Sequence, residues 1–285
     1  MSFSTAAPFA MLIAQVSDLH VGRPGERVGG RVDTADCLRR CVARLNRLTP
    51  RPDLVALTGD LVNAGDPEEY RHLRSLLEPL ELRWVLIPGN HDHRGALRAA
   101  FKDHAHLGRD PDFIHYVIDD FPVRLVFADT LDPGREEGRL DAARLAWLEA
   151  RFQEAPNTPT MLFMHHPPFA SGLDAMDRTG CAGAEALAAL LQRNPQVERV
   201  CCGHLHRPVF VRWAGTCGCV APSCAHQLAL DLRPGASTGF VLEPPAFLLH
   251  LWRPGVGLVT HLCLVDPFPG PYPFSMSLRS MVDEP

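Results

Sequence analysis

Several features that assign chains to a particular class are absent from this sequence of 285 residues. No apolar run approaches the roughly 20 residues that a membrane-spanning helix requires. The first residues lack the basic start and long apolar stretch of a secretory signal, and Met11–Val16 is better interpreted as a first strand. No stripe of lysine and arginine stands out, and a formal net charge of -5 gives no general attraction to a polyanion. We therefore expect a cytoplasmic protein with neither a membrane nor a nucleic acid as its partner.

The zinc-ribbon spacing C-x-x-C is also missing, although the chain has nine cysteines. These cysteines lie in varied contexts, such as adjacent Cys201 and Cys202 in an apolar run and alternating Cys217 and Cys219. A long chain without an export signal favours reduced, mostly buried thiols over a disulfide framework. No internal repeat or low-complexity block indicates a repeat architecture either.

What is present is an alternation of short β-rich runs and amphipathic helical stretches up to about His206, which is typical of a layered α/β fold. Thr34–Leu48 carries apolar residues at helical spacing. Asp66-Pro67-Glu68-Glu69 has the cap, the first-turn proline and the acids that open a helix. Further strands are expected at 54–57, 84–87, 125–128, 161–164 and 197–202, and further helices at 141–152 and 182–191.

Beyond Arg207 the chain consists of short apolar runs interrupted by proline and glycine. This pattern predicts a second, mostly antiparallel sheet built from 209–211, 227–230, 247–250 and 258–260. With 46% hydrophobic residues, the chain can bury one large core. We expect a catalytic domain over residues 1–266 and a proline-rich tail over 267–285. The apolar residues of this C-terminal region suit either a contact in a homodimer or higher homo-oligomer or a contact within the chain.

Half of the fourteen histidines fall in four short segments, each of which follows a predicted strand. A fifth segment, Gly59-Asp60, adds a carboxylate after the strand at 54–57. The histidine segments are Ser17-Asp18-Leu19-His20, Gly89-Asn90-His91-Asp92-His93, His165-His166-Pro167-Pro168 and Gly203-His204-Leu205-His206. Each alone has an ordinary explanation, such as a solvated loop, a helix cap or a hydrogen-bonded core histidine. Their joint occurrence at the carboxyl ends of strands, where open α/β sheets place their sites, favours a metal centre.

The chemistry of these segments suits two metal ions. In a strand, residues two apart point to the same side, so Asp18 and His20 can direct a carboxylate and an imidazole at one point. The carboxylate of Asp60 has two oxygens and can bridge two ions about 3.5–4 Å apart. Asn90 offers a neutral oxygen ligand, and His91 is left over. This set of ligands predicts a two-metal phosphoesterase.

The blocks D-x-H, G-D, G-N-H, a later histidine and G-H-x-H occur here in the order of the calcineurin-like metallophosphoesterase superfamily, which the chain resembles over nearly its whole length. Segments 59–65, 67–70, 164–168 and 175–177 resemble the branch that holds class III cyclic nucleotide phosphodiesterases and bacterial glycerophosphodiesterases. The resemblance implies a four-layer αββα metallophosphoesterase sandwich with two mixed β-sheets.

The resemblance also implies a ligand set. One metal would be held by Asp18, His20, Asp60 and His206, and a second by Asp60, Asn90, His165 and His204, with Asp60 as the bridge. Members of the superfamily use iron, manganese, zinc or cobalt, and ligation by nitrogen and oxygen does not choose among them. We expect two divalent ions, with manganese or iron favoured.

The expected reaction is hydrolysis of a small phosphodiester through attack by a metal-bridging hydroxide, with His91 protonating the leaving alkoxide. Two divalent ions, reduced by two carboxylates and one hydroxide, leave about +1, which matches a phosphodiester monoanion. Asn63, Arg94 and His166 are expected to contact the substrate; their alternatives are turn capping and surface solvation.

Three neighbouring residues receive secondary predictions. We expect Asp92 to orient an imidazole, and Met176 and Asp177 to form a wall of the pocket, with loop packing as the alternative.

Two substrate classes stay open, 3′,5′-cyclic nucleotides and glycerophosphodiesters, because pocket loops decide between them. A phosphomonoesterase or pyrophosphatase at the same site is the alternative, since a dianion would be attracted even more strongly. A non-catalytic scaffold is disfavoured, because neither the ligands nor His91 have been replaced.

Overall fold

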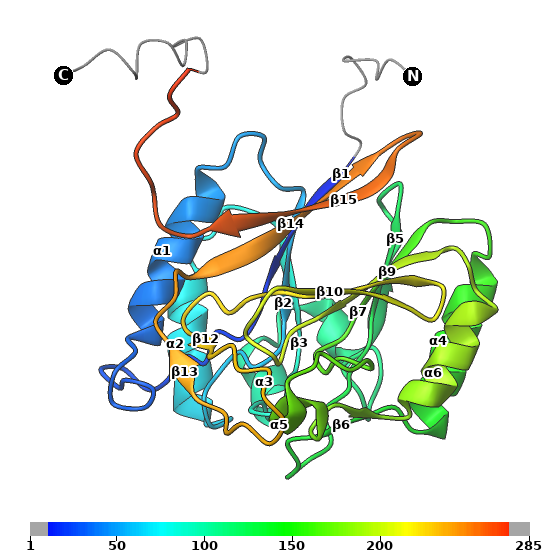
Figure 1. The fold of residues 1–285 in the computed structure, drawn as a ribbon, viewed down its shortest axis with the longest axis horizontal. Helices are drawn as coiled ribbons and strands as arrows, with labels where there is room; N and C mark the ends of the chain where they lie inside the picture. Colours follow the sequence, from blue (N-terminus) through cyan, green and yellow to red (C-terminus); the bar gives the residue numbers. More distant parts are fainter. Residues whose placement is uncertain (1–10, 274–285) are drawn as a thin grey trace.

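Two β-sheets lie face to face between two layers of helices in the computed structural model, which describes residues 11–273 (Figure 1). The first sheet has the order β15 (Gly257–Leu264), β14 (Ala246–Arg253), β1 (Met11–Val16), β2 (Leu54–Thr58), β3 (Trp84–Ile87). The second has the order β10 (Val209–Trp213), β11 (Thr216–Val220), β9 (Val197–Cys202), β7 (Thr160–Phe163), β5 (Arg124–Phe127), β4 (Tyr116–Ile118).

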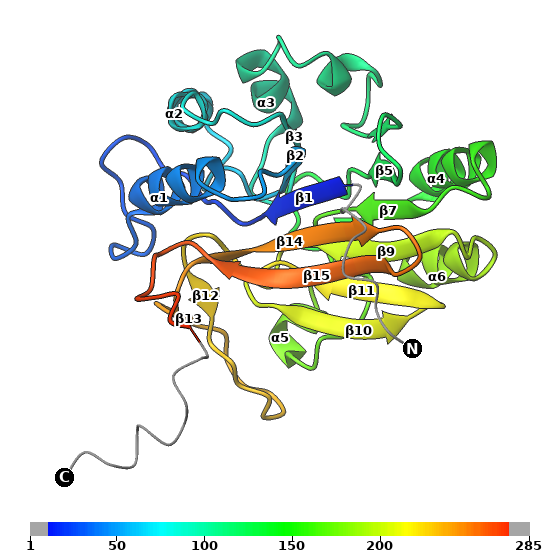
Figure 2. The ribbon, with the colours of Figure 1, turned by 90° about the horizontal axis from the view of Figure 1, so that it is seen from above.

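Helices cover the outer face of each sheet. Beside the first sheet lie α1 (Thr34–Asn46), α2 (Pro67–Leu77) and α3 (Arg94–Ala100), and beside the second lie α4 (Ala142–Glu154) and α6 (Ala184–Gln192) (Figures 1 and 2). Both sheets are mixed. In the first, β1, β2 and β3 are parallel and the antiparallel strands β14 and β15 lie at one edge. In the second, the parallel strands β11, β9, β7 and β5 lie between antiparallel partners at both edges. The predicted αββα sandwich with two mixed sheets is therefore confirmed.

Strands buried on both faces explain why the sequence has apolar runs rather than strict alternation. In β5, Leu125 and Phe127 belong to the core between the sheets, whereas Val126 packs with the helical layer of α4 and α6. The rings of Phe127 and Phe163 stack across β5 and β7 with their centroids 4.8 Å apart. This inter-sheet core holds the two sheets, and hence their strand ends, in a fixed relation.

The predicted helix starts are observed. Asp66 caps α2 and forms a capping box with Glu69, whose carboxylate accepts the backbone N–H of Asp66 at 3.1 Å. The expected helices at 34–48, 141–152 and 182–191 correspond to α1, α4 and α6, with ends shifted by at most two residues. Elements that were not predicted are α3, η1 (Ala105–Gly108), β4, β6 (Gly138–Arg139), α5 (Asp174–Asp177), β8 (Cys181–Ala182), β11 and β13 (Phe240–Val241).

The prediction of a separate C-terminal sheet is wrong. β14 pairs antiparallel with β1, and β15 with β14, so both extend the first sheet, while β10 and β11 extend the second. Each addition covers a strand edge that would otherwise present unpaired backbone groups. A two-stranded sheet of β12 (Gln227–Leu228) and β13 (Phe240–Val241) stands apart, and the predicted strand at 227–230 ends at Leu228.

The boundary between a catalytic domain and a tail at residue 266 stays a prediction. Residues 267–273 contain no helix or strand, whereas residues 1–10 and 274–285 lie outside the described part of the chain. All nine cysteines are free thiols. Within residues 11–273, none of the helices combines the length and the apolar character that crossing a membrane requires.

The second helical layer offers a test of the packing. Leu148 on α4 is fully buried among residues of β5, β7, β9 and α6, so Leu148→Ala is expected to lower the free energy of unfolding by about 2–5 kcal/mol. Leu242, which is 68% exposed, supplies the matched control, and Leu242→Ala should change the free energy of unfolding by less than about 0.5 kcal/mol. Urea unfolding of both variants measures the difference; equal losses would contradict this packing.

Candidate metal centre

The loops that follow five strands of the two sheets bring most of the predicted ligands together. One group of potential ligand atoms, all within 4.8 Å of one another, comes from Asp18, His20, Asp60 and His206. A second group, within the same limit, comes from His165, His166 and His204. The strands that deliver these residues are β1, β2, β7 and β9, and the loop after β3 adds Asn90 beside them. The site therefore lies where both sheets end.

Asp60 lies between the two groups. Its Oδ2 is 3.5 Å from Nε2 of His20, and its Oδ1 is 3.4 Å from Nε2 of His165. Burial alone would raise the pKa of this carboxyl, but His165, His20 and His91 outweigh it and hold the pKa well below its usual range. An ionised carboxylate with one oxygen towards each group has the geometry of a bridging ligand.

Backbone strain is concentrated at this centre. Among residues 11–273, six non-glycine residues have a positive φ, and five of them are predicted ligands. The five are Asp18 (φ 55°), His20 (φ 45°), Asp60 (φ 49°), His204 (φ 71°) and His206 (φ 47°). A left-handed conformation of such a residue costs on the order of 1–3 kcal/mol and persists where the surroundings enforce it, most often at functional sites. The strain points to function independently of the residue types.

The glycines of the motifs leave the space that the ligands occupy. A Cβ atom at Gly59 would overlap the ring of His165, and one at Gly89 would overlap the carboxylate of Asp60. Gly59 also has φ +94°, which few other residues adopt. A Cβ at Gly203 would overlap Ser17 and approach Asp18. The backbones of the loops thus approach the ligand side chains as closely as glycine allows.

Hydrogen bonds fix the orientation of the imidazoles. Nδ1 of His165 donates to the carbonyl of Thr58 at 2.8 Å, and Nδ1 of His206 donates to the carbonyl of His226 at 3.0 Å. A carbonyl oxygen can only accept, so each Nδ1 carries a proton and Nε2 is the ring nitrogen left for a metal. Both Nε2 atoms face the centre: that of His165 lies 3.4 Å from Oδ1 of Asp60, and that of His206 lies 3.0 Å from Nε2 of His20. Metal-ligating histidines are commonly held in this way, with the other ring nitrogen donating to a carbonyl oxygen.

The residues present fit two divalent ions. Among the described residues, Nε2 of His165 and Oδ1 of Asn90 are buried without a hydrogen-bond partner, in the positions expected of ligand atoms. Burial lowers the pKa of His20 well below its usual value and that of His204 to about 3, which keeps both imidazoles neutral and able to ligate. Mixed nitrogen and oxygen donors suit borderline transition-metal ions.

His91, predicted as a proton donor rather than a ligand, lies at the exposed side of the centre. Its backbone N–H donates to Oδ1 of Asp60 at 2.9 Å, and its Nδ1 donates to the carbonyl of Asn63 at 2.6 Å. Its ring meets that of His20 edge to face, with centroids 4.7 Å apart. Both His91 and Asn63 line a cavity of about 630 Å³ that opens over the metal ligands.

The other two predicted substrate contacts do not line this cavity. The guanidinium of Arg94 donates two hydrogen bonds to the buried carboxylate of Asp129, with N–O distances of 2.6 and 2.8 Å. His166 is fully buried, and its Nδ1 lies 2.8 Å from the hydroxyl of Thr130. Its ring centroid is 4.8 Å from those of both His165 and His204, so His166 packs beside the predicted metal ligands.

The expectation that Asp92 orients an imidazole is wrong. Its Oδ2 accepts the backbone N–H groups of Gly89 at 2.8 Å and Leu61 at 3.1 Å, and its Oδ1 accepts the hydroxyl of Tyr70 at 2.8 Å. Burial, and then the charge of Asp60, raises the pKa of Asp92 to about 7. Asp92 therefore ties the loops after β2 and β3 together instead of contacting a ring.

Three further residues of the motifs have mixed outcomes. Met176 lines the cavity, as expected for a pocket wall. Asp177 instead accepts hydrogen bonds from Ser171 and Gly172 and so closes its own loop. His93 caps α3 through Nδ1, which accepts the N–H of Ala96 at 3.2 Å.

His226 belongs to the site and was missed in the sequence. Its carbonyl orients His206, its ring centroid lies 4.7 Å from that of His206, and its side chain lines the cavity. Burial, and then His206, lowers its pKa to about 4. The segment Ser223–Gln227 matches none of the motif blocks, so only the path of the chain after β11 reveals it.

Comparisons with known proteins agree with this geometry. Residues 11–208 match the family model of the calcineurin-like phosphoesterases. The chain is 37% identical, over 96% of its own length and 100% of the relative's, to a protein of Arcobacter nitrofigilis named as a probable glycerophosphodiester phosphodiesterase. It is 33% identical, over 85% of its length and 76% of the relative's, to a cAMP/cGMP dual-specificity phosphodiesterase of Mycobacterium tuberculosis.

A solved structure shows the same fold. A dimetal phosphatase from Danio rerio superposes with a TM-score of 0.64 over 91% of this chain and 100% of its own. The two sequences are 15% identical, so the likeness concerns the fold alone.

The close approach of Gly89 to Asp60 provides a test of the centre. Gly89→Ala is expected to displace the Asp60 carboxylate and to lower the metal content after loading with Mn²⁺ from two ions per chain towards one or none. Gly108→Ala is the matched control, because a Cβ there meets open space. Elemental analysis of both variants decides the point; full metal content in Gly89→Ala would contradict the assignment.

Proposed function

Because the chain belongs to the calcineurin-like phosphoesterase family, we propose that it hydrolyses small phosphodiesters, with glycerophosphodiesters and 3′,5′-cyclic nucleotides as its substrate classes. The observation that carries the proposal is the convergence of two ligand groups on the Asp60 carboxylate beneath a cavity of about 630 Å³. Relatives named for both substrate classes match most of the chain, which supports the same chemistry here. A cytoplasmic location and a homo-oligomer stay predictions.

Two metal ions are proposed to occupy the centre, with Asp18, His20, Asp60 and His206 on one side and Asp60, Asn90, His165 and His204 on the other. When bound, divalent ions lower the pKa of a nucleophilic water and neutralise charge that develops on the phosphoryl oxygens. Manganese or iron stays our preferred identity, although the mixture of imidazole nitrogen with carboxylate and amide oxygen suits several first-row divalent ions.

The role proposed for His91 follows from its hydrogen bonds. Because the Asn63 carbonyl holds the proton on Nδ1, the second proton of a cationic His91 ring resides on Nε2. Because the ring is exposed and lines the cavity, its Nε2 can reach a leaving oxygen there. Protonation of that oxygen avoids release of an alkoxide and typically contributes about 10²–10⁴ in rate.

Substitutions of His91 and of Asp60 are expected to have different effects on metal content and activity. His91→Ala should keep the metal content and lower kcat by about 10²–10⁴ for diesters with alkyl leaving groups, and by much less for bis-p-nitrophenyl phosphate, whose phenolate leaves without a proton. Asp60→Ala should lose metal and activity together, because both ligand groups contact this carboxylate. Metal analysis alongside kinetics tests the pair; a fully active Asp60 variant would overturn the mechanism.

A substrate panel tests the function itself. Protein loaded with Mn²⁺ is expected to hydrolyse cAMP, cGMP, glycerophosphoethanolamine or bis-p-nitrophenyl phosphate with higher kcat/KM than p-nitrophenyl phosphate. The reason is that the relatives that match most of the chain are named for phosphodiesters, and we propose the same preference here. Turnover of the monoester alone would identify a phosphomonoesterase and would contradict the proposal.

A further inference from the structure

We propose that Glu136, on the lip of the catalytic cavity, selects phosphodiesters in which one alcohol carries a cationic amine. This inference rests on the function proposed above and deepens it, because it concerns the alcohol and not the bond that is cleaved. Glu136 is exposed, follows none of the metal-binding motifs and lies in the loop before β6.

The short β6–β8 pair places this carboxylate. β6 and β8 run parallel, with Gly138 opposite Cys181, and the N–H of Gly138 donates to the carbonyl of Gly180 at 2.9 Å. The segments that precede the two strands therefore run side by side. They carry Glu136 and Arg178, both of which line the cavity. One lip of the cavity thus presents one carboxylate and one guanidinium.

Neither charge is neutralised by the protein. Within residues 11–273, Glu136 and Arg178 form no ion pair with each other or with another side chain at 4.0 Å or less. The other carboxylate that lines the cavity, that of Asp60, belongs to the metal centre. Glu136 is therefore the acidic group of the cavity that is free to recognise a substrate cation.

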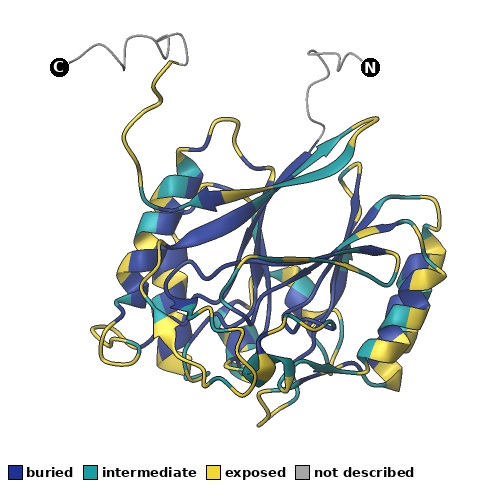
Figure 3. Cartoon of the chain, in the orientation of Figure 1, coloured by how far each residue is buried: buried dark blue, intermediate teal, exposed yellow. Residues whose placement is uncertain are grey.

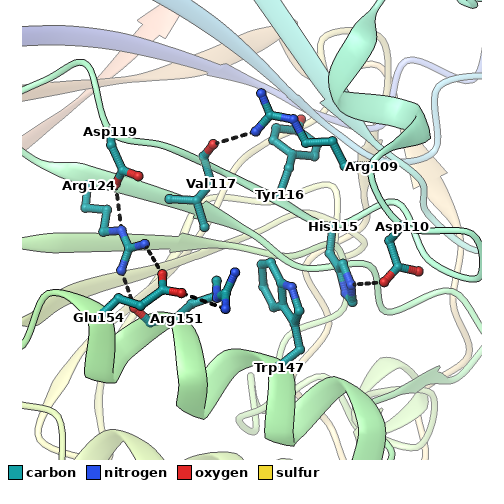
Figure 4. Close-up of a pocket in the computed structure, with 10 residues that line it drawn as sticks. All are labelled: Arg109, Asp110, His115, Tyr116, Val117, Asp119, Arg124, Trp147, Arg151 and Glu154. Carbon is teal, nitrogen blue, oxygen red and sulfur yellow. Dashed lines mark hydrogen bonds and ion pairs between the residues drawn. The ribbon is translucent and has the colours of Figure 1, made fainter.

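A second hollow, between β4 and α4, shows the opposite arrangement (Figure 4). Its volume is about 300 Å³, and each of its carboxylates has a partner: Asp110 pairs with His115, Asp119 with Arg124, and Glu154 with Arg124 and Arg151. Trp147 stacks on His115 with centroids 4.1 Å apart. The carboxylates of that hollow are neutralised by partners within the protein, whereas Glu136 on the lip of the catalytic cavity has no such partner.

The rest of the cavity wall suits the carbon chain of such an alcohol. Val28, Met176, Leu228 and Phe240 contribute apolar side chains to it. A short aminoalkyl group can pack its methylene carbons there and keep its ammonium in contact with the carboxylate on the lip. An alcohol without an amine gains nothing from Glu136, whose negative charge also repels the phosphodiester anion. The expected effect is selectivity between alcohols and not a general gain in rate.

Glu136→Gln tests the inference with two glycerol diesters, glycerophosphoethanolamine and the amine-free glycerophosphoglycerol. The variant is expected to lower kcat/KM for the amine-bearing diester by roughly 3- to 5-fold at low salt, as an exposed ion pair allows, and to leave the amine-free diester unchanged or faster. The difference should shrink as ionic strength rises, because salt screens exposed charges. Glu136→Lys should lower kcat/KM for the amine-bearing diester further, because it replaces an attractive charge with a repulsive one.

Two controls separate this role from a general one. Glu137→Gln removes the neighbouring carboxylate, which does not line the cavity, and should leave both rates unchanged. Arg178→Gln should lower both rates to a similar degree, since a guanidinium attracts the phosphodiester whichever alcohol it carries. A Glu136→Gln variant with an unaltered ratio of the two rates would overturn the inference alone. If the wild-type protein hydrolysed no diester at all, both this inference and the proposed function would be contradicted.

Discussion

The contact of one carboxylate with two sets of imidazoles is the interaction on which the rest of the site depends. Asp60 lies 3.5 Å from His20 and 3.4 Å from His165, and these histidines come from different sheets. A small movement of one sheet relative to the other would therefore lengthen at least one of these two distances. The stacked core between the sheets, such as Phe127 on Phe163 together with Phe247 of β14, therefore serves the chemistry as well as the stability.

The same dependence explains the strained backbone around Asp60. Five ligand residues in a left-handed conformation represent several kcal/mol of unfavourable energy, which the fold must offset elsewhere. Asp92 supplies part of that support, because it accepts the N–H groups of Gly89 and Leu61 and so ties the loop that carries Asp60 to the loop after β3. Tyr70 extends the support to α2. The helical layer outside the first sheet thus contributes to a centre that it does not touch.

Much of the fold was predictable because the relevant information is local. Most of the parallel strands are short, mainly apolar runs of four to six residues that end in a polar block, so these strands, their order along the chain and most of the predicted ligands follow from neighbouring residues. The partners of the C-terminal strands were not predictable, since β14 and β15 have the composition of any antiparallel pair. Their addition to β1 depends on an open edge that only the assembled sheet presents.

Inside the site, contacts between residues that are distant in the sequence limited what could be predicted. Arg94 was expected to reach substrate, but Asp129, 35 positions later, is placed by β5 to bind two of its three donor nitrogens. His226 was missed because its position beside His206 arises from the return of the chain after β11. In both cases the residue type was compatible with several roles, and the fold selected one of them.

The site therefore divides into two parts with different structural origins. The predicted metal ligands follow strand ends, where strain, glycine contacts and buried hydrogen bonds leave little freedom for substitution. The outer cavity is built from the loop before β6, the short helix α5 and the short β12–β13 pair with its loop, whose lining side chains are half-buried or exposed. Loops of this kind accept substitutions that the strand ends cannot, because fewer contacts depend on each side chain. Proteins with this centre can thus keep the reaction at phosphorus unchanged while the lip, where Glu136 lies, adapts to the alcohol.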